Sequence, residues 1–101
     1  MSLLTASGLI RAVRNKGLPI SPATVSGWIK DNPAIARRFT NRWLFQPETP
    51  DLLDLGLMPR DIAMLITIEV PLGEAVELLR AGAGLDEVVV RLRPSPPLEA
   101  A

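Results

Sequence analysis

The sequence predicts a mostly α-helical protein that contains one small β-hairpin. Two amphipathic segments before residue 33 indicate helices, because their apolar residues recur at intervals of three and four. Between residues 34 and 46, two runs rich in aromatic and branched side chains flank a two-residue turn, as in a hairpin. Residues 57–92 then repeat with a period of 13, which indicates a short helical array.

The first amphipathic segment is "TASGLIRAVRNKG", residues 5–17. Leu9, Ile10 and Val13 fall on one face of a helix, and we expect this face to be buried. Gly17 is a typical residue just past the end of a helix, because glycine adopts the left-handed conformation at no steric cost. The segment therefore predicts one short helix that ends before Gly17.

The second amphipathic segment is "SPATVSGWIKDN", residues 21–32. Ser21 followed by Pro22 marks the start of a helix. The serine hydroxyl caps free backbone N–H groups, and proline has no backbone N–H that would need a partner at the first helical position. Three large residues share the face that we expect to be buried: Val25, Trp28 and Ile29. The opposite face is small and consists of Ala23, Ser26, Gly27 and Lys30. Such a face fits a DNA major groove about 12 Å wide, although an ordinary amphipathic helix would look the same.

The predicted hairpin is "AIARRFTNRWLFQ", with the dipeptide Thr40-Asn41 as its turn. Asparagine tolerates the left-handed conformation that such turns need, but glycine is absent and the turn type stays open. The expected cross-strand pairs are Phe39 with Arg42 and Arg38 with Trp43. Arginines therefore gather at the tip. By strand alternation Arg37 shares a face with Ile35 and Phe39, so Arg37 is a candidate for pairing with protein instead of phosphate.

Charge is distributed unevenly along a chain whose formal net charge is zero. Residues 1–50 hold seven Lys and Arg residues against two carboxylates, whereas residues 51–101 hold four against nine, so the halves carry +5 and −5. A basic half attracts polyanions such as nucleic acid. The alternative is a pair of solvated surfaces of opposite sign.

The chain contains no cysteine and no histidine. This composition excludes disulfide bonds, zinc sites of the Cys or His type, and Ser-His or Cys-His nucleophile pairs. We therefore expect no enzymatic activity, no metal and no cofactor. No apolar run reaches the roughly 18 residues of a membrane span, and no signal peptide is recognisable, so we expect a cytoplasmic protein without a membrane partner.

The acidic half contains three similar segments, which we expect to form short helices beginning near Pro59, Leu72 and Leu85. The last segment, "EVVVRL", also has the propensity of a strand. Two roles remain open for this module: a surface for self-association or for another protein, and a simple cap on the basic half. The sequence thus divides into a module at 1–50, an acidic module at 51–93 and a Pro-rich tail at 94–101 that we expect to be disordered.

The first 50 residues resemble the winged helix-turn-helix family that includes phage excisionases and the DNA-binding domains of MerR-type regulators. The resemblance rests on Leu4-Thr5, on "SPATVSGWIK" and on "RRFTNRWLF", while the interval from Thr5 to Thr24 is several residues longer than in the family. It implies that the second helix enters the major groove and that the hairpin, or wing, holds the flanking DNA. The implied DNA-binding residues are Ala23, Thr24, Ser26, Gly27, Lys30, Arg37, Arg38, Asn41 and Arg42.

The resemblance implies a sequence-specific double-stranded DNA-binding protein of phage or mobile-element type. Two roles fit this description equally: a transcriptional regulator, and a recombination directionality factor that bends DNA for an integrase. The alternative from another class is a protein-protein adaptor that acts through the C-terminal helical array.

Overall fold

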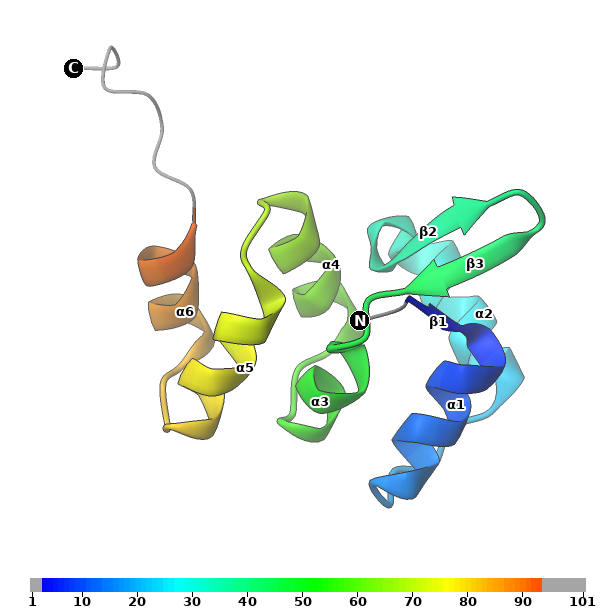
Figure 1. Ribbon diagram of the computed structural model, residues 1–101, viewed down its shortest axis with the longest axis horizontal. Helices are drawn as coiled ribbons and strands as arrows, with labels where there is room; N and C mark the ends of the chain where they lie inside the picture. The colour runs from blue at the N-terminus through cyan, green and yellow to red at the C-terminus, as the bar shows by residue number, and fades with distance from the viewer. Residues whose placement is uncertain (1–2, 94–101) are drawn as a thin grey trace, which may run out of the picture.

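The computed structural model describes residues 3–93 and confirms a mostly helical protein with one small antiparallel sheet (Figure 1). None of the helices in this range is long and apolar enough to cross a membrane. In chain order the elements are β1 (Leu4–Thr5), α1 (Ala6–Asn15), α2 (Pro22–Asp31), the 3-10 turn η1 (Pro33–Ile35), β2 (Ala36–Phe39), β3 (Arg42–Phe45), α3 (Thr49–Asp54), α4 (Pro59–Thr67), α5 (Leu72–Arg80) and α6 (Leu85–Leu92).

The two N-terminal helices begin and end where the sequence signals place them. The Thr5 hydroxyl caps α1 by accepting a hydrogen bond from the Gly8 N–H at 3.1 Å. Ser21 caps α2 in the same way, accepting from the Thr24 N–H at 3.3 Å. Gly17 follows α1 with a φ of 87°, which is the left-handed conformation expected of a residue that ends a helix.

The inner face of α2 is narrower than the sequence predicts. Val25 is buried, but Trp28 and Ile29 are only half-buried and pack against the edge of the core. At 100° per residue, Val25 lies between the other two on the helix surface, so it alone faces the core directly. The expectation that all three are fully buried is therefore wrong for Trp28 and Ile29.

The hairpin pairs in the predicted register, with Arg38 opposite Trp43 and Phe39 opposite Arg42. The left-handed residue of the turn is Thr40, with a φ of 59°, and not the expected Asn41. Ile35 lies in η1 and is fully buried, so it is not part of the strand that carries Arg37. Its position before the strand follows from Pro33, which starts a 3-10 turn.

The sheet has a third strand, β1, that the sequence analysis did not predict, and its order is β1-β3-β2. Leu4 pairs with Phe45 and Thr5 with Leu44, so β3 is the central strand. Phe45 is fully buried there, between Leu4 and Ala36 on the neighbouring strands. A two-residue strand carries too little periodicity to be recognised in a sequence.

The 13-residue period is confirmed as a helical array. α4, α5 and α6 begin at Pro59, Leu72 and Leu85, and "EVVVRL" is helical and not a strand. α4 and α5 are followed by left-handed residues 13 positions apart, Glu69 with a φ of 62° and Gly82 with a φ of 101°. The same pair of hydrogen bonds closes each helix in a Schellman motif; its longer-range bonds are Val70 N–H to Leu65 C=O and Ala83 N–H to Leu78 C=O, both at 3.0 Å.

The array contains a fourth helix, α3, where the sequence analysis expected only a break between the halves. Gly56 has a φ of 96°, and its N–H bonds to the Leu53 carbonyl while the Leu57 N–H bonds to the Leu52 carbonyl, both at 3.1 Å. This is the Schellman motif of the later helices, shifted by 13 residues. The repeat also appears in burial, because Thr49, Ile62, Ala75 and Val88 all have no exposed surface. The array therefore begins before residue 50.

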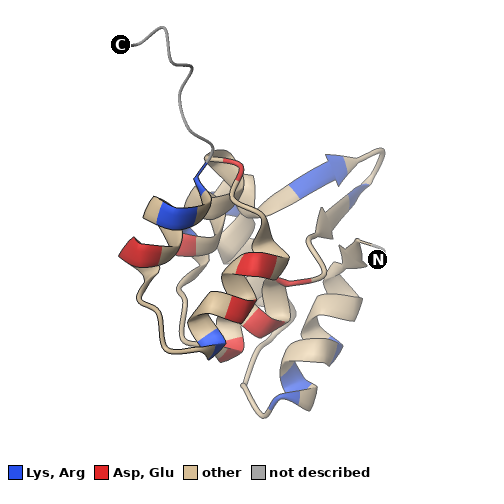
Figure 2. Ribbon diagram, turned by 60° about the vertical axis from the view of Figure 1, so that its left-hand side comes forward, with Lys and Arg blue, Asp and Glu red and all other residues tan. Residues whose placement is uncertain are grey.

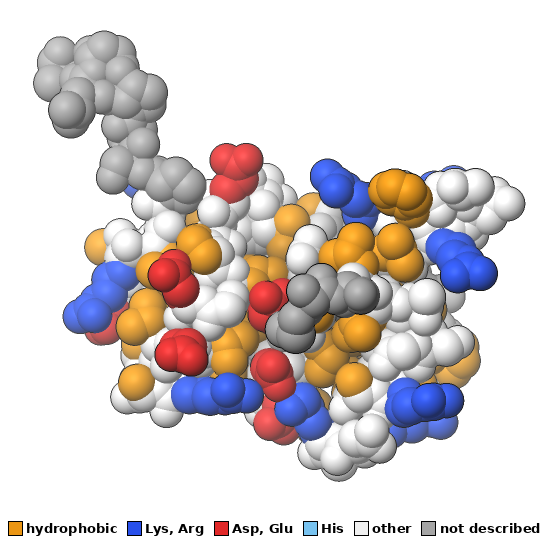
Figure 3. Space-filling view, viewed as in Figure 1, with side chains coloured by type: hydrophobic (Ala, Val, Ile, Leu, Met, Phe, Trp, Pro, Cys, Tyr) orange, Lys and Arg blue, Asp and Glu red, His pale blue; other side chains and the backbone are white. Residues whose placement is uncertain are grey.

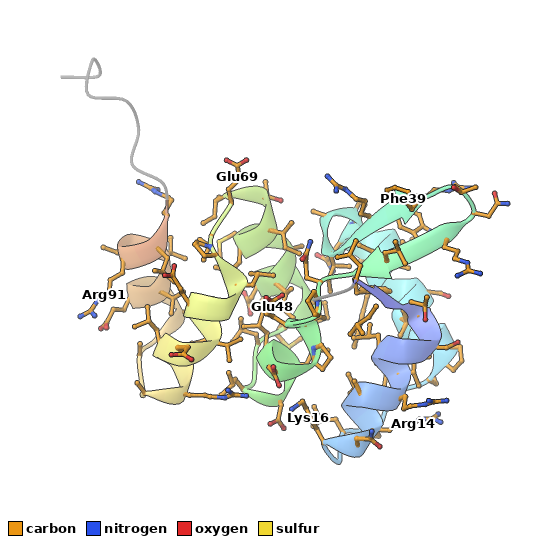
Figure 4. All side chains as sticks on the ribbon, in the orientation of Figure 1. Arg14, Lys16, Phe39, Glu48, Glu69 and Arg91 are labelled. Carbon is orange, nitrogen blue, oxygen red and sulfur yellow. The ribbon has the colours of Figure 1, made fainter. Side chains whose placement is uncertain are left out.

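One hydrophobic core runs through both halves of the described chain. Its buried residues extend from Leu9 in α1, through Phe45 and Leu52, to Val88 in α6. α3 packs against α1, and Lys16 Nζ lies 2.7 Å from Asp51 Oδ1 across this contact (Figure 4). The expected boundary at residue 50 thus falls inside α3, within a shared core. The expected tail, 94–101, lies outside the described residues.

Candidate nucleic-acid interface

The hairpin β2–β3 projects from the end of the molecule opposite to α6 (Figure 1). Phe39, near its tip, is 60% exposed and points away from the helices (Figure 4). Figure 3 shows hydrophobic and basic side chains next to one another over this part of the surface. The wing therefore offers both positive charge and an apolar contact to a partner.

The three wing arginines, Arg37, Arg38 and Arg42, are exposed. Within residues 3–93 the ion pairs are Lys16 with Asp51, Arg80 with Asp51 and Arg91 with Glu87, and no wing arginine takes part in one. Figure 2 shows most of the visible carboxylates on the helices of the array and none on the hairpin. The positive charge of the wing is therefore free to attract an anion.

Each wing arginine has a different setting. The Arg38 guanidinium lies 5.9 Å from the ring centroid of Trp43, its cross-strand neighbour, in a cation–π arrangement that restrains it. Arg42, next to the turn, lines a groove that it shares with α2. Arg37 lines a separate groove beside α4, together with Ile66. The structure thus brings Arg42 close to α2 and places Arg37 nearer to the array, where no carboxylate of the described chain pairs with it.

The free face of α2 has the composition that the sequence predicts. Ala23, Ser26 and Lys30 are exposed, and Gly27 lies between them on the same face. Thr24 is exposed as well, but its hydroxyl lies 3.0 Å from that of Ser21 and belongs to the cap of the helix. Lys30 is the only charged side chain among the five candidate residues of α2, and the exposed carboxylate of Asp31 follows it at the end of the helix.

A groove of about 540 Å³ separates α2 from the wing. Its polar lining includes Ser26 of α2, Asn41 and Arg42 of the wing, and Ser7 in the first turn of α1, and its apolar lining includes Val25, Ile29 and Trp43. Sequence reasoning did not single out Ser7, because nothing in the sequence places the start of α1 beside the wing. The pairing of β1 with β3 does so. Hydroxyl and amide groups with one free arginine suit the phosphates of a nucleic-acid backbone.

Gly27 is a glycine that the fold does not require. Its backbone is helical without a positive φ, and a Cβ at this position would meet no atom within 4 Å. Glycine within a helix costs about 0.5–1 kcal/mol relative to alanine. Neither the backbone conformation nor the packing of Gly27 within the described chain accounts for this cost.

Within residues 3–93, no cluster of three or more acidic residues is arranged to hold a metal ion. Searches of protein-family models, of curated proteins and of solved structures found no match to this chain.

Proposed function

We propose that this protein binds double-stranded DNA sequence-specifically and acts as a regulatory protein without a cofactor. The observation that carries the proposal is a juxtaposition: Ser26, on the free face of α2, and Arg42 of the wing border the same groove. Duplex DNA has two surfaces that match these elements: an open major groove for the helix, and a phosphate backbone beside it for the arginine. The proposed location of the protein is the cytoplasm.

In this arrangement α2 enters the major groove with its small face. Ala23 and Gly27 allow the backbone of the helix to approach the base edges, where Thr24, Ser26 and Lys30 supply hydroxyl and ammonium groups. The wing lies on the flanking DNA, with Arg37, Arg38, Asn41 and Arg42 toward its phosphates or its minor groove. The groove between the two elements then accommodates the intervening sugar-phosphate backbone.

The proposed biological role is that of a small regulator of phage or mobile-element type, either a transcriptional regulator or a recombination directionality factor. Both roles need occupancy of a defined site and no chemistry, which suits a chain without cysteine or histidine. Bending of the bound DNA is the property that separates them, because a directionality factor must deform its site to assemble a recombination complex.

A second candidate function is protein-protein adaptation by the array. It is favoured by a groove of about 660 Å³ between α5 and α6, in which Leu78 and Leu92 lie next to Glu74, Glu77 and Arg91. An apolar floor beside charged residues of both signs fits an amphipathic segment of a partner. An adaptor of this kind would bind its partner at the array and show no salt-dependent affinity for DNA.

Arg42→Ala tests the proposed position of the wing. We expect this change to weaken binding to all duplexes by a similar factor, and to reduce the slope of log K against log salt by about one, as for one lost phosphate contact. Fluorescence anisotropy with several unrelated duplexes over a range of salt concentrations measures both quantities.

Arg60→Ala is the matched control, because Arg60 is an exposed arginine of α4 on the acidic half. It removes the same charge and should leave the salt slope nearly unchanged. Equal effects of the two changes would show that binding follows net charge alone, and a loss confined to one base position would place Arg42 on a base.

A further inference from the structure

The last helix of the array lacks the cover that its predecessors have. Pro50, Ala63 and Val76 occupy equivalent positions in α3, α4 and α5, and all three are buried. The equivalent residue of α6, Val89, is only half-buried. In a stacked array each unit is covered by the next one, so α6 retains a face that another unit would occupy.

Next to Val89, the residue Val90 is 80% exposed, the highest exposure among the large hydrophobic residues of the described chain. Asp86 and Val90 lie four residues apart in α6, and Arg93, three residues further on, is its C-cap residue with a φ of −61°, so the three residues lie on the same side of α6 as Val89. α6 forms the end layer of the molecule, far from the wing (Figure 1). Its free side is therefore an apolar strip with a carboxylate at one end and a guanidinium at the other.

The charges of this strip are self-complementary. Arg91 already pairs with Glu87 inside the helix, with Nε 3.3 Å from Oε2 (Figure 4). Asp86 and Arg93 take part in no ion pair within residues 3–93. When two such strips meet in antiparallel orientation with the valines at the centre, each Asp86 faces the Arg93 of the other copy.

We propose that the occupant of this face is a second copy of the chain, and that α6 forms a two-fold symmetric, antiparallel helix pair. Val89 and Val90 pack against the same residues of the other copy, and two Asp86–Arg93 contacts flank them. The two helix dipoles are then antiparallel, which adds a small attraction. A two-fold interface of this kind uses one surface patch twice and closes at the dimer.

The proposed dimer does not rest on DNA binding, because α6 and the wing lie at opposite ends of the molecule (Figure 1). α6 has eight residues and is about 12 Å long, so each copy contributes less than the roughly 800 Å² of a standard interface. The pair is therefore weak in isolation, with a dissociation constant on the order of 100 µM. On adjacent DNA sites such a contact raises apparent affinity through effective concentration.

The test is sedimentation equilibrium of the full chain without DNA at protein concentrations from about 10 µM to 1 mM, the range that brackets such a constant. The parent protein is expected to shift from its monomer mass of 11.0 kDa toward twice that mass. Asp86→Arg and Arg93→Asp should each weaken dimerisation at least about tenfold, because two attractions become two repulsions. The double variant D86R/R93D should restore it to within about threefold of the parent.

Val90→Asp should abolish the dimer by placing two like charges at its centre. Met64→Asp is its matched control, because Met64 occupies the equivalent position of α4 and is exposed. Circular dichroism confirms that each variant is folded. A parent that stays monomeric at 1 mM overturns the proposal. So does a dimer that Val90→Asp leaves intact, or one that the double exchange does not restore, because either result assigns the contact to another surface or partner.

Discussion

Replacing Leu52 with alanine is expected to destabilise both halves of the protein together, although Leu52 lies in the acidic half. Leu52 is fully buried, and its helix, α3, packs against α1 of the basic half. Truncation of a buried leucine costs about 2–5 kcal/mol, out of a typical total of about 5–15 kcal/mol. For a chain of this size the unfolding temperature should fall by more than about 10 °C.

The two tryptophans make this prediction measurable, since Trp28 and Trp43 are the only ones and both lie in the basic half. Tryptophan fluorescence therefore reports the basic half, while far-UV circular dichroism reports helices throughout. The two signals should move to the same lower temperature in Leu52→Ala. Leu53→Ala is the control, because Leu53 is only half-buried on the same helix. A fluorescence transition that stays at the parent temperature would show that the halves unfold separately.

Gly27→Glu is expected to weaken DNA binding by about 100-fold or more without unfolding the protein. The new side chain has open space around it, since a Cβ at Gly27 meets nothing within 4 Å. It places a carboxylate on the face that we assign to the major groove, and like charges brought together at an interface cost several kcal/mol. A cost of about 1.4 kcal/mol corresponds to a tenfold loss of affinity.

Two further variants, one at Gly27 and one on α4, separate the effect on DNA binding from the effect on folding. Gly27→Ala should raise the free energy of unfolding by about 0.5–1 kcal/mol, because alanine is the better helix former. Met64→Glu adds the same charge to an exposed position of α4 and should reduce DNA affinity only slightly. Anisotropy and thermal melts measure the two effects. Gly27→Glu binding within about threefold of the parent would remove α2 from the interface.

Local signals in the sequence were sufficient to predict most of the helices and the hairpin register. Ser21-Pro22 and Gly17 act through backbone chemistry that depends on neighbouring residues alone. The turn at Thr40-Asn41 fixes the cross-strand pairs because hairpin register follows from loop length. The 13-residue period was also readable, since each unit places similar residues at its start.

Features that depend on tertiary contacts were not predictable in this way. α3 was missed because its unit begins with Gln46 and carries Thr49 and Pro50 where the later units have apolar or helix-forming residues. The partial exposure of Trp28 follows from the position of α2 at the edge of the core, which the period of the helix does not determine. The candidate residues of α2 and the wing could be named from sequence, but the groove that joins them depends on the pairing of β1 with β3.

Selection of bound duplexes from a random-sequence pool tests the central claim most directly. The full chain is incubated with the pool at moderate salt, and the bound DNA is amplified and sequenced over several rounds. We predict enrichment of one defined motif, with enrichment lost in Gly27→Glu and a motif unchanged but less strongly enriched in Arg42→Ala. Recovery of no motif by the parent protein, together with no salt-dependent binding to any duplex, would contradict the account and leave the array as the functional part of the molecule.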